Sequence, residues 1–290
     1  MFPASFEYVA ARSVKEAIEL LTQHGEEAKL LAGGHSLIPA MKLRLVSPRT
    51  LIDLGRIPGL SGVRMDGKSL VIGALTVHTD VASSDLVRRD FSGLAEAASV
   101  IGDLQVRNRG TIGGSVAHAD PAADLPVILT ALDASFILQS ASANRSVGAQ
   151  DFFLDYYTTA LAPNEVLTEI RLPLPTGAAA TAYAKLPHPA SGYVVVSAGV
   201  LIEFNSAGGC ASARVAIGGL GNRPTRALAS EAALRGQPLT ASVIAAAAAK
   251  AAEGTDPDGD IYASAEYKRH VATVYTRKAI EVAVGARHQA

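Results

Sequence analysis

The 290-residue sequence contains a single cysteine, Cys210, and no tryptophan. One thiol excludes an internal disulfide, a zinc site built from cysteines and an iron–sulfur cluster held by this chain alone. The seven histidines show none of the spacings typical of metal ligands, so no metal site is predicted. Redox chemistry in this chain would therefore depend on a bound organic cofactor or on partner subunits.

The sequence also lacks a strong excess of charge and a long apolar run. Lys and Arg total 26 and Asp and Glu total 27, a balance that favours neither nucleic acid nor a basic partner. The longest apolar stretch, residues 243–252, is shorter than the ~18 residues of a membrane span. The first residues lack the basic and apolar regions of a signal peptide. We therefore expect a cytoplasmic protein with no membrane span.

What the chain does have is enough apolar sequence to form sizeable cores. It is 49% hydrophobic and 18% charged, which excludes disorder, and its length favours two domains, with one large or three small ones as alternatives. The clearest composition shift lies at residues 173–180, where two prolines and a glycine precede three alanines. We expect a domain boundary there.

The pattern of apolar residues predicts a mixed α/β (α+β) fold. In the first part, strands at 6–9, 29–32 and 50–54 alternate with helices at 14–24 and 37–45, the order of a small parallel sheet. Ser13 and Glu16 have the spacing of a capping box. The middle part predicts strands at 69–75, 135–139, 145–147 and 166–172 and helices at 93–101 and 125–132. The last part predicts three strands, at 181–186, 193–204 and 211–218, followed by helices at 225–234, 243–253 and 265–284.

Two glycine loops could bind an anion. The first loop, residues 32–36, and the second loop, residues 110–115, each place paired glycines beside apolar residues and end in a serine. Glycine lets the backbone approach a ligand closely and turn its N–H groups in one direction. Ser36 also stands where it would cap the following helix. The two loops together could hold one pyrophosphate from both sides, although each loop alone could equally form an ordinary turn.

Other binding motifs are absent or ambiguous. Neither loop has the P-loop or the G-x-G-x-x-G spacing, and no hydrolytic motif is present. Asp124 could cap a helix, or accept hydrogen bonds from ribose hydroxyls or an adenine amine. His35 and His118 are assigned no role in proton transfer. The sequence therefore predicts no catalytic residue.

Five segments, residues 6–8, 32–39, 105–114, 120–124 and 165–173, occur in the same order in a known family. The chain resembles the FAD-binding medium subunit of the molybdenum hydroxylases, the group of carbon monoxide dehydrogenase and xanthine dehydrogenase. The resemblance covers essentially the whole chain. It implies a two-part FAD-binding region of the vanillyl-alcohol-oxidase or PCMH type, residues 1–57 and 58–176, followed by a flavoprotein C-terminal domain with a three-stranded antiparallel sheet, residues 177–290.

The resemblance also implies a function. A large subunit with a molybdopterin cofactor would hydroxylate substrate, a small subunit would carry two [2Fe-2S] clusters, and this chain would pass electrons through FAD to an acceptor. The complex would be a dimer of such heterotrimers. Two alternatives remain, namely a self-sufficient FAD-dependent oxidoreductase and a nucleotide-binding scaffold without redox activity.

The cofactor-binding residues implied by the resemblance cluster around the two loops. Tyr193 matches the aromatic residue that covers one flavin face, although it could also be an ordinary strand tyrosine. Ser115 replaces the family's usual asparagine, which offers two polar groups instead of one. The implied set is Lys29, Leu30, Leu31, Ala32, Gly33, Gly34, His35, Ser36, Leu37, Gly110, Thr111, Gly113, Gly114, Ser115, Ala117, His118, Asp124, Leu167, Lys185 and Tyr193.

Overall fold

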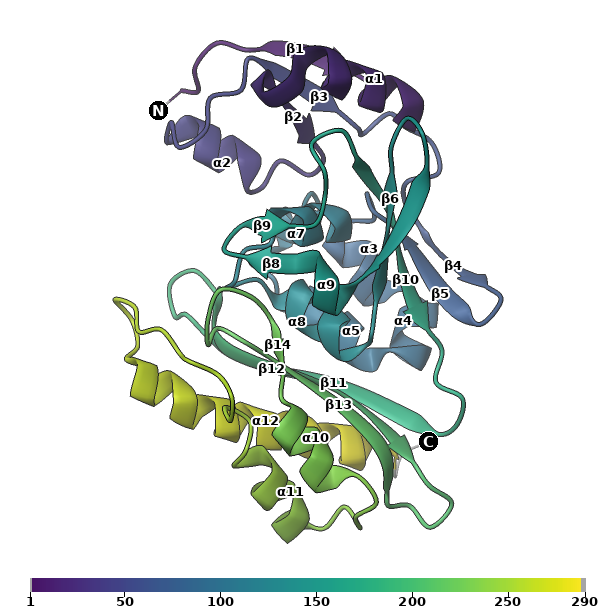
Figure 1. The fold of residues 1–290 in the computed structure, drawn as a ribbon, viewed down its shortest axis with the longest axis vertical. Coiled ribbons are helices and arrows are strands. Elements are labelled where there is room, and N and C mark those ends of the chain that lie inside the picture. Colours follow the sequence, from purple (N-terminus) through teal and green to yellow (C-terminus); the bar gives the residue numbers. More distant parts are fainter. Residues whose placement is uncertain (1, 288–290) are drawn as a thin grey trace.

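In the computed structural model, which describes residues 2–287, helices and strands form three parts that follow one another along the chain (Figure 1). The N-terminal lobe comprises β1 (Glu7–Ala10), α1 (Val14–His24), η1 (Gly25–Glu27), β2 (Ala28–Leu31), α2 (Leu37–Lys42) and β3 (Thr50–Asp53). Its sheet has the order β1-β3-β2 with both pairings parallel, which confirms the predicted parallel sheet. This lobe packs around a small apolar cluster that also includes Leu60 and Val166 of the central part.

The ends of two helices in this lobe refine the prediction. Ser13 Oγ accepts a hydrogen bond from Glu16 N, as expected, but Glu16 Oε2 accepts from Arg12 N rather than from Ser13 N. The predicted helix over residues 37–45 ends at Lys42, because Arg44 adopts the left-handed conformation (φ 62°). Leu45 N then donates to Ala40 O, which closes the end of α2.

The central part contains an antiparallel sheet of order β4-β5-β10-β6-β7. The strands are β4 (Val63–Asp66), β5 (Ser69–Gly73), β6 (Ser135–Gln139), β7 (Asn144–Gly148) and β10 (Val166–Pro173), with a separate hairpin of β8 (Phe153–Asp155) and β9 (Thr158–Thr159). The helices are α3 (His78–Ser83), α4 (Asp85–Asp90), α5 (Ser92–Ser99), α6 (Leu104–Arg107), α7 (Ile112–His118), α8 (Asp124–Ala131) and α9 (Ala149–Phe152). The prediction missed β4, the hairpin and the shortest helices, since elements of two to six residues carry little periodicity.

The C-terminal part has four strands where three were predicted. They are β11 (Ala179–Pro187), β12 (Val194–Phe204), β13 (Cys210–Gly218) and β14 (Thr225–Arg226), in the order β11-β12-β13-β14. Three helices follow: α10 (Leu228–Leu234), α11 (Ala241–Ala248) and α12 (Ala265–Arg287). The predicted helix at 225–234 was wrong at its start, because its first two residues pair with Ile217 and Ala216 on β13.

The C-terminal sheet lies between helices of two different parts of the chain. Figure 1 shows α5 and α8 of the central part over one face of the sheet and α12 over the other, and all three contact it. The approach is close: a Cβ built on Gly93 of α5 would lie 2.7 Å from Ala182 N of β11. Ser92 Oγ donates to Thr181 O, and Gly93 N donates to Thr181 Oγ1. The sheet is therefore bonded to the central part as well as packed on it.

Within residues 2–287, no helix combines the length and apolar character needed to cross a bilayer. The longest helix, α12, has 23 residues but carries charged side chains along its length.

Candidate functional site

The two glycine loops lie against each other, although about 75 residues separate them in the chain. A Cβ built on Gly33 would lie 2.1 Å from Arg109 O and 2.8 Å from Gly110 Cα. A Cβ built on Gly114 would lie 4.0 Å from Ala32 Cβ. We call the contact of Gly33 with Arg109 and Gly110 the seam. Because real Cβ atoms do not approach other atoms within 3 Å, only glycine fits at position 33.

The first loop offers unpaired hydrogen-bond donors. It runs from β2 to α2, with Gly34 in the left-handed region (φ 74°) and Leu31 Cδ1 3.2 Å from a Cβ placed there. Across the described part of the chain, no acceptor receives a hydrogen bond from the amides of residues 33–37. Ser36 is the N-cap residue of α2, as predicted, but its Oγ accepts no hydrogen bond from the helix. A row of free amides beside glycines is a suitable cradle for an anionic group.

The second loop is built differently. Gly113 and Gly114 belong to the first turn of α7, whose N-cap is Thr111. The amides of residues 112–115 are already bonded, in chain order to Thr76 O, Ala74 O, Thr111 Oγ1 and Thr111 O. The second loop therefore presents fewer free amides than expected, since among residues 110–115 only the Thr111 amide has no acceptor in the described part of the chain. What this loop offers is close backbone approach and the half-buried Ser115 hydroxyl, which has no hydrogen-bond partner among the described residues.

Asp124 is held by protein groups rather than by the end of its helix. The N-cap of α8 is Ala123, so the predicted capping role of Asp124 was wrong. Its buried Oδ1 accepts a hydrogen bond from Tyr183 Oη (2.9 Å) and lies 2.8 Å from Lys185 Nζ. Burial raises the pKa of the Asp124 carboxyl, and the Lys185 ammonium opposes that shift. Lys185 Nζ also donates to Val100 O and Gly192 O, so this ion pair ties α5, α8 and the β11–β12 turn together.

Three ring-bearing side chains lie near the C-terminal end of α7. The His118 ring, at the end of that helix, lies 5.2 Å from the Tyr157 ring in the β8–β9 turn. Tyr193, which precedes β12, is 48% exposed. Partial burial and the nearby Asp120 carboxylate raise the pKa of both tyrosines. The ring contact and the shared Asp120 carboxylate therefore bring two predicted site residues, His118 and Tyr193, near the unpredicted Tyr157.

Tyr157, His78 and Tyr183 were missed by the sequence analysis. Tyr157 has a left-handed backbone (φ 50°), a conformation that costs energy in a non-glycine residue and is common at functional sites. His78 begins α3 behind the second loop, and Tyr183 reaches Asp124 from β11. No local pattern identifies these residues, because their neighbours come from distant parts of the chain.

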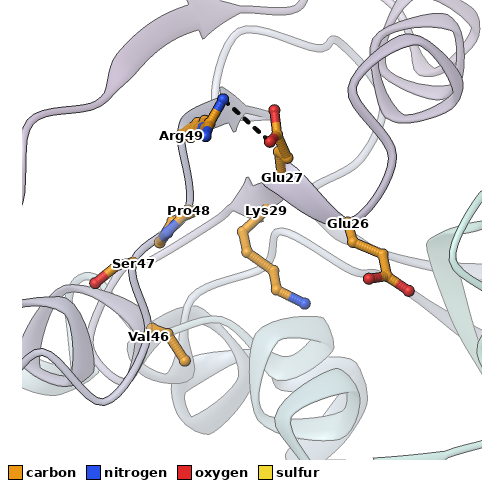
Figure 2. Close-up of a pocket in the computed structure, with 7 residues that line it drawn as sticks. All are labelled: Glu26, Glu27, Lys29, Val46, Ser47, Pro48 and Arg49. Atoms are coloured by element: carbon orange, nitrogen blue, oxygen red, sulfur yellow. Dashed lines mark ion pairs between the residues drawn. The ribbon is translucent and has the colours of Figure 1, made fainter.

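The residues that precede the first loop face two directions. Along β2, Leu30 packs on the core of the N-terminal lobe, so Lys29 and Leu31 point the other way. Lys29 lines a shallow pocket of about 360 Å³. Figure 2 shows it there with Glu26, Glu27 and Arg49. Arg49 Nη1 lies 3.2 Å from Glu27 Oε1. Two carboxylates make this pocket a poor site for a diphosphate.

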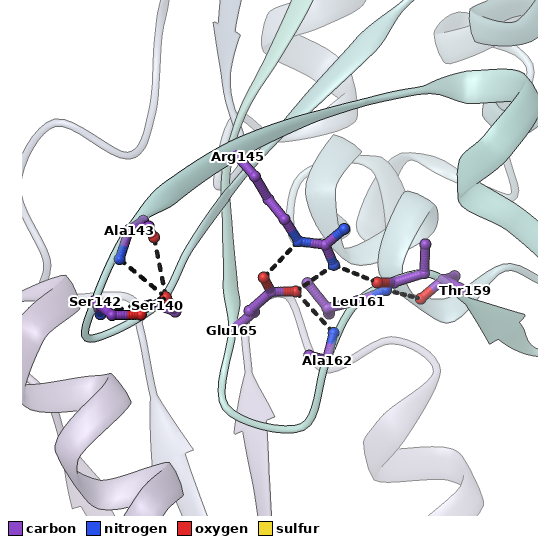
Figure 3. A network of polar contacts seen from close by, with 9 residues as sticks. Ser140, Ser142, Ala143, Arg145, Thr159, Leu161, Ala162 and Glu165 are labelled. Atoms are coloured by element: carbon purple, nitrogen blue, oxygen red, sulfur yellow. Dashed lines mark hydrogen bonds and ion pairs between the residues drawn. The ribbon is translucent and has the colours of Figure 1, made fainter.

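The β8–β9 hairpin is followed by a braced loop. Figure 3 shows Arg145 of β7 bonded twice to Glu165, through Nε and Nη2 at 2.7 Å each. Arg145 Nη2 also donates to Ala160 O, and Ala162 N donates to Glu165 Oε2. The hydrogen bonds from Arg145 lower the pKa of the Glu165 carboxyl. This brace fixes the chain between the hairpin and β10.

Leu167 lies on β10 behind the second loop. It is buried at an irregularity in the pairing of β10 with β6. Its neighbour Thr168 accepts a hydrogen bond from Ala74 N, and Ala74 O accepts from Gly113 N. A continuous line of hydrogen bonds thus joins β10 to the second loop.

The described residues contain neither a metal cluster nor a reactive thiol. Between residues 2 and 287, no group of three or more His, Cys, Asp or Glu side chains could hold a metal ion. Cys210 is buried, and burial raises the pKa of its thiol to about 11.

The chain matches two protein families and several named relatives. Residues 4–175 match the FAD binding domain in molybdopterin dehydrogenase, and residues 181–283 match the CO dehydrogenase flavoprotein C-terminal domain. The carbon monoxide dehydrogenase medium chain of Hydrogenophaga pseudoflava is 42% identical over 284 residues, 98% of both chains. The glyceraldehyde dehydrogenase medium chain of Sulfolobus acidocaldarius is 38% identical over 281 residues, 97% of this chain and 99% of the relative.

The fold agrees with these matches. The solved structure of the Hydrogenophaga pseudoflava carbon monoxide dehydrogenase that lacks the Mo-pyranopterin moiety of the molybdenum cofactor contains a similar chain. The two superpose with a TM-score of 0.94, at 44% identity and over 99% of both chains.

Proposed function

The chain belongs to the family of FAD-binding medium subunits of the molybdenum hydroxylases, and we propose that it binds FAD across the seam between its two glycine loops. It is an oxidoreductase subunit of the electron-transfer type. The observation that carries the binding site is the seam itself, where Gly33 approaches the backbone of Arg109 and Gly110 beside a row of unpaired amides. Those amides supply hydrogen-bond donors of the kind that a diphosphate requires.

Within this proposal the two loops have different tasks. The free amides of residues 33–37 donate to the diphosphate, while the paired amides of the second loop hold α7 rigid and leave Ser115 Oγ to contribute one hydrogen bond. His118, Asp124, Leu167, Lys185 and Tyr193 are proposed to surround the flavin end. The remaining proposed contacts are Lys29, Leu30, Leu31, Ala32, Gly110, Thr111, Gly113, Gly114 and Ala117, of which Leu30 could take part through its backbone only.

Bound FAD supplies the ability to accept and release electrons, which no side chain of this chain provides. The protein's part is to orient the cofactor and to limit water around it. The Lys185–Asp124 ion pair and its bonds to Val100 O and Gly192 O fix the turn that carries Tyr193. No proton transfer is assigned to a residue of this chain.

The partners follow from the same membership. We propose a large subunit with the molybdopterin cofactor and a small subunit with [2Fe-2S] clusters, assembled with this chain as a dimer of heterotrimers in the cytoplasm. Relatives that carry the words medium chain in their names support the presence of larger and smaller partner subunits. The substrate would be chosen on the large subunit and not here.

The proposed domain division is 1–57, 58–176 and 177–290. The separate sheet of order β1-β3-β2 supports the first boundary, and the change from one matched family to the other between residues 175 and 181 supports the second. Limited proteolysis with mapping of the fragments would test these limits.

The experiment for FAD binding uses the complex purified with its partner subunits. The parental complex should contain about one FAD per medium chain, and its flavin should be reduced when the substrate is added. Gly114→Asp should lose the FAD, because the new carboxylate would stand beside Ala32, where the loops meet. The matched control is Gly177→Asp, where a Cβ would meet nothing within 4 Å.

A parental complex without FAD would contradict the proposal. So would a Gly114→Asp complex that keeps its flavin. A chain that oxidises a substrate without its partners would instead identify a self-sufficient enzyme.

A further inference from the structure

His78, a residue outside the proposed set of cofactor contacts, lies directly behind the second loop. It is the first residue of α3 and is 5% exposed. Its backbone N–H donates to Gly110 O at 3.0 Å, and the preceding Val77 forms an isolated antiparallel bridge with Thr111. The start of α3 is thus bonded to the start of the second loop.

The His78 ring contacts the glycine that forms the seam. A Cβ built on Gly110 would lie 2.8 Å from His78 Nε2 and 2.9 Å from His78 Cδ2. Gly110 Cα is also the atom that a Cβ on Gly33 would meet at 2.8 Å. Gly110 therefore touches the His78 ring and the first loop at once, and a displacement of the ring would change the position of the seam.

The ring provides shape rather than charge. Its Nδ1 is buried and has no hydrogen-bond partner among the described residues. Burial, together with the charges of His35 on the first loop and Arg107 on α6, lowers the pKa of His78 to about 4. The imidazole is therefore neutral near pH 7, and packing holds it in place.

We propose that His78 is a positioning residue of the cofactor site, whose ring supports Gly110 and so sets the separation of the two glycine loops. The inference rests on the proposed function, since FAD is the ligand that the two loops would hold. His78 itself makes no contact with the ligand in this proposal and acts through Gly110.

The test measures the rate at which FAD leaves the purified complex, followed by the rise of flavin fluorescence after dilution. His78→Ala should release FAD about tenfold faster, because removing the ring leaves Gly110 unsupported. His78→Phe keeps a flat ring and should release FAD within about twofold of the parental rate. With FAD in excess, His78→Ala should recover the parental rate of acceptor reduction, since only affinity is affected.

A matched control separates positioning from general stability. Val81→Ala shortens a fully buried side chain on the same helix without touching Gly110. It should lower the melting temperature of the complex yet leave the rate of FAD release within about twofold of the parental value.

Three outcomes would overturn the inference. They are parental release from His78→Ala, release from His78→Phe as fast as from His78→Ala, and equally fast release from Val81→Ala. A parental complex that binds no FAD would overturn the proposed function as well. If the parental complex binds FAD, any of the three outcomes refutes only the role proposed for His78.

Discussion

At Gly33 the missing side chain decides whether the two loops can touch. The group that a Cβ would meet at 2.1 Å is a backbone carbonyl, which cannot rotate away as the end of a flexible side chain can. At Gly114 the close neighbour is the Thr111 hydroxyl at 2.8 Å, which caps α7. Even the methyl group of an alanine should therefore disturb the seam at position 33, whatever the charge of the new side chain.

We expect Gly33→Ala to weaken FAD binding by about tenfold or more, because forcing the loops apart costs about 1–3 kcal/mol. Equilibrium titration of the cofactor-depleted complex with FAD would measure this change. Gly177→Ala is the control, as its Cβ would meet nothing within 4 Å. Equal affinities for parent and Gly33→Ala would show that the seam does not shape the cofactor site.

His78 predicts a dependence of stability on pH. Its folded pKa, about 4, lies below the unfolded value of 6.5, so the unfolded chain binds more protons between these limits. Stability should therefore fall as the pH decreases from about 6.5 to 4, and this shift corresponds to about 3 kcal/mol at most. The charges that face the ring are those of His35 and Arg107.

Urea unfolding at a series of pH values would measure this contribution. The difference in unfolding free energy between parent and His78→Phe should change in favour of His78→Phe as the pH falls. A difference that stays constant from pH 7 to 4 would show that His78 does not titrate as its burial requires.

Among the elements, the contact of α5 with β11 joins the central part to the C-terminal sheet. Gly93→Ala should destabilise the protein by about 1–3 kcal/mol, since the new Cβ would lie 2.7 Å from Ala182 N. The midpoint of urea unfolding would record the loss. Gly148→Ala is the matched control, with open space around its Cβ position. An unchanged midpoint in Gly93→Ala would mean that the two parts adjust without cost.

The long helices and strands and the contact between the two loops were predicted from the sequence. The pairing of the short strand β14 and the hydrogen-bond partners of the second loop's amides were not. Strands β10 and β12 were found because their apolar runs are long, whereas β14 exists only because β13 offers it partners. Glycine pairs marked both loops. The second loop's amides are bonded to Ala74 O and Thr76 O, some 36 to 39 residues away in sequence, and no local pattern shows such a contact. For the same reason Asp124 was expected as a cap, although Lys185 and Tyr183 hold it.

On the scale of the whole molecule, the proposed site lies where the N-terminal lobe meets the central part. The lobe's apolar cluster continues into the central part through Leu60 and Val166, and α1 and the seam are further contacts with the rest of the chain. A ligand held at such a junction contacts both parts of the chain at once.

We expect a complex that carries Gly114→Asp to keep one half of the electron pathway. Substrate should still reduce the iron–sulfur clusters of the partner subunit, while reduction of the natural acceptor should fall to background. Absorbance changes of the clusters and of the acceptor would be followed in the same sample. An added one-electron dye should restore turnover. If the FAD-free complex reduced the natural acceptor at the parental rate, electrons would not need to pass from the clusters through FAD.

The unequal amides of the two loops have a thermodynamic consequence. The amides of the first loop would bond a diphosphate that the second loop also contacts, so bound FAD would link the N-terminal lobe to the central part. Bound FAD should therefore protect the exposed Leu43 and Leu45 from protease. The half-life of the N-terminal lobe against digestion should lengthen as the concentration of free FAD increases. In that sense the cofactor is a piece of the tertiary structure, supplied from outside the chain.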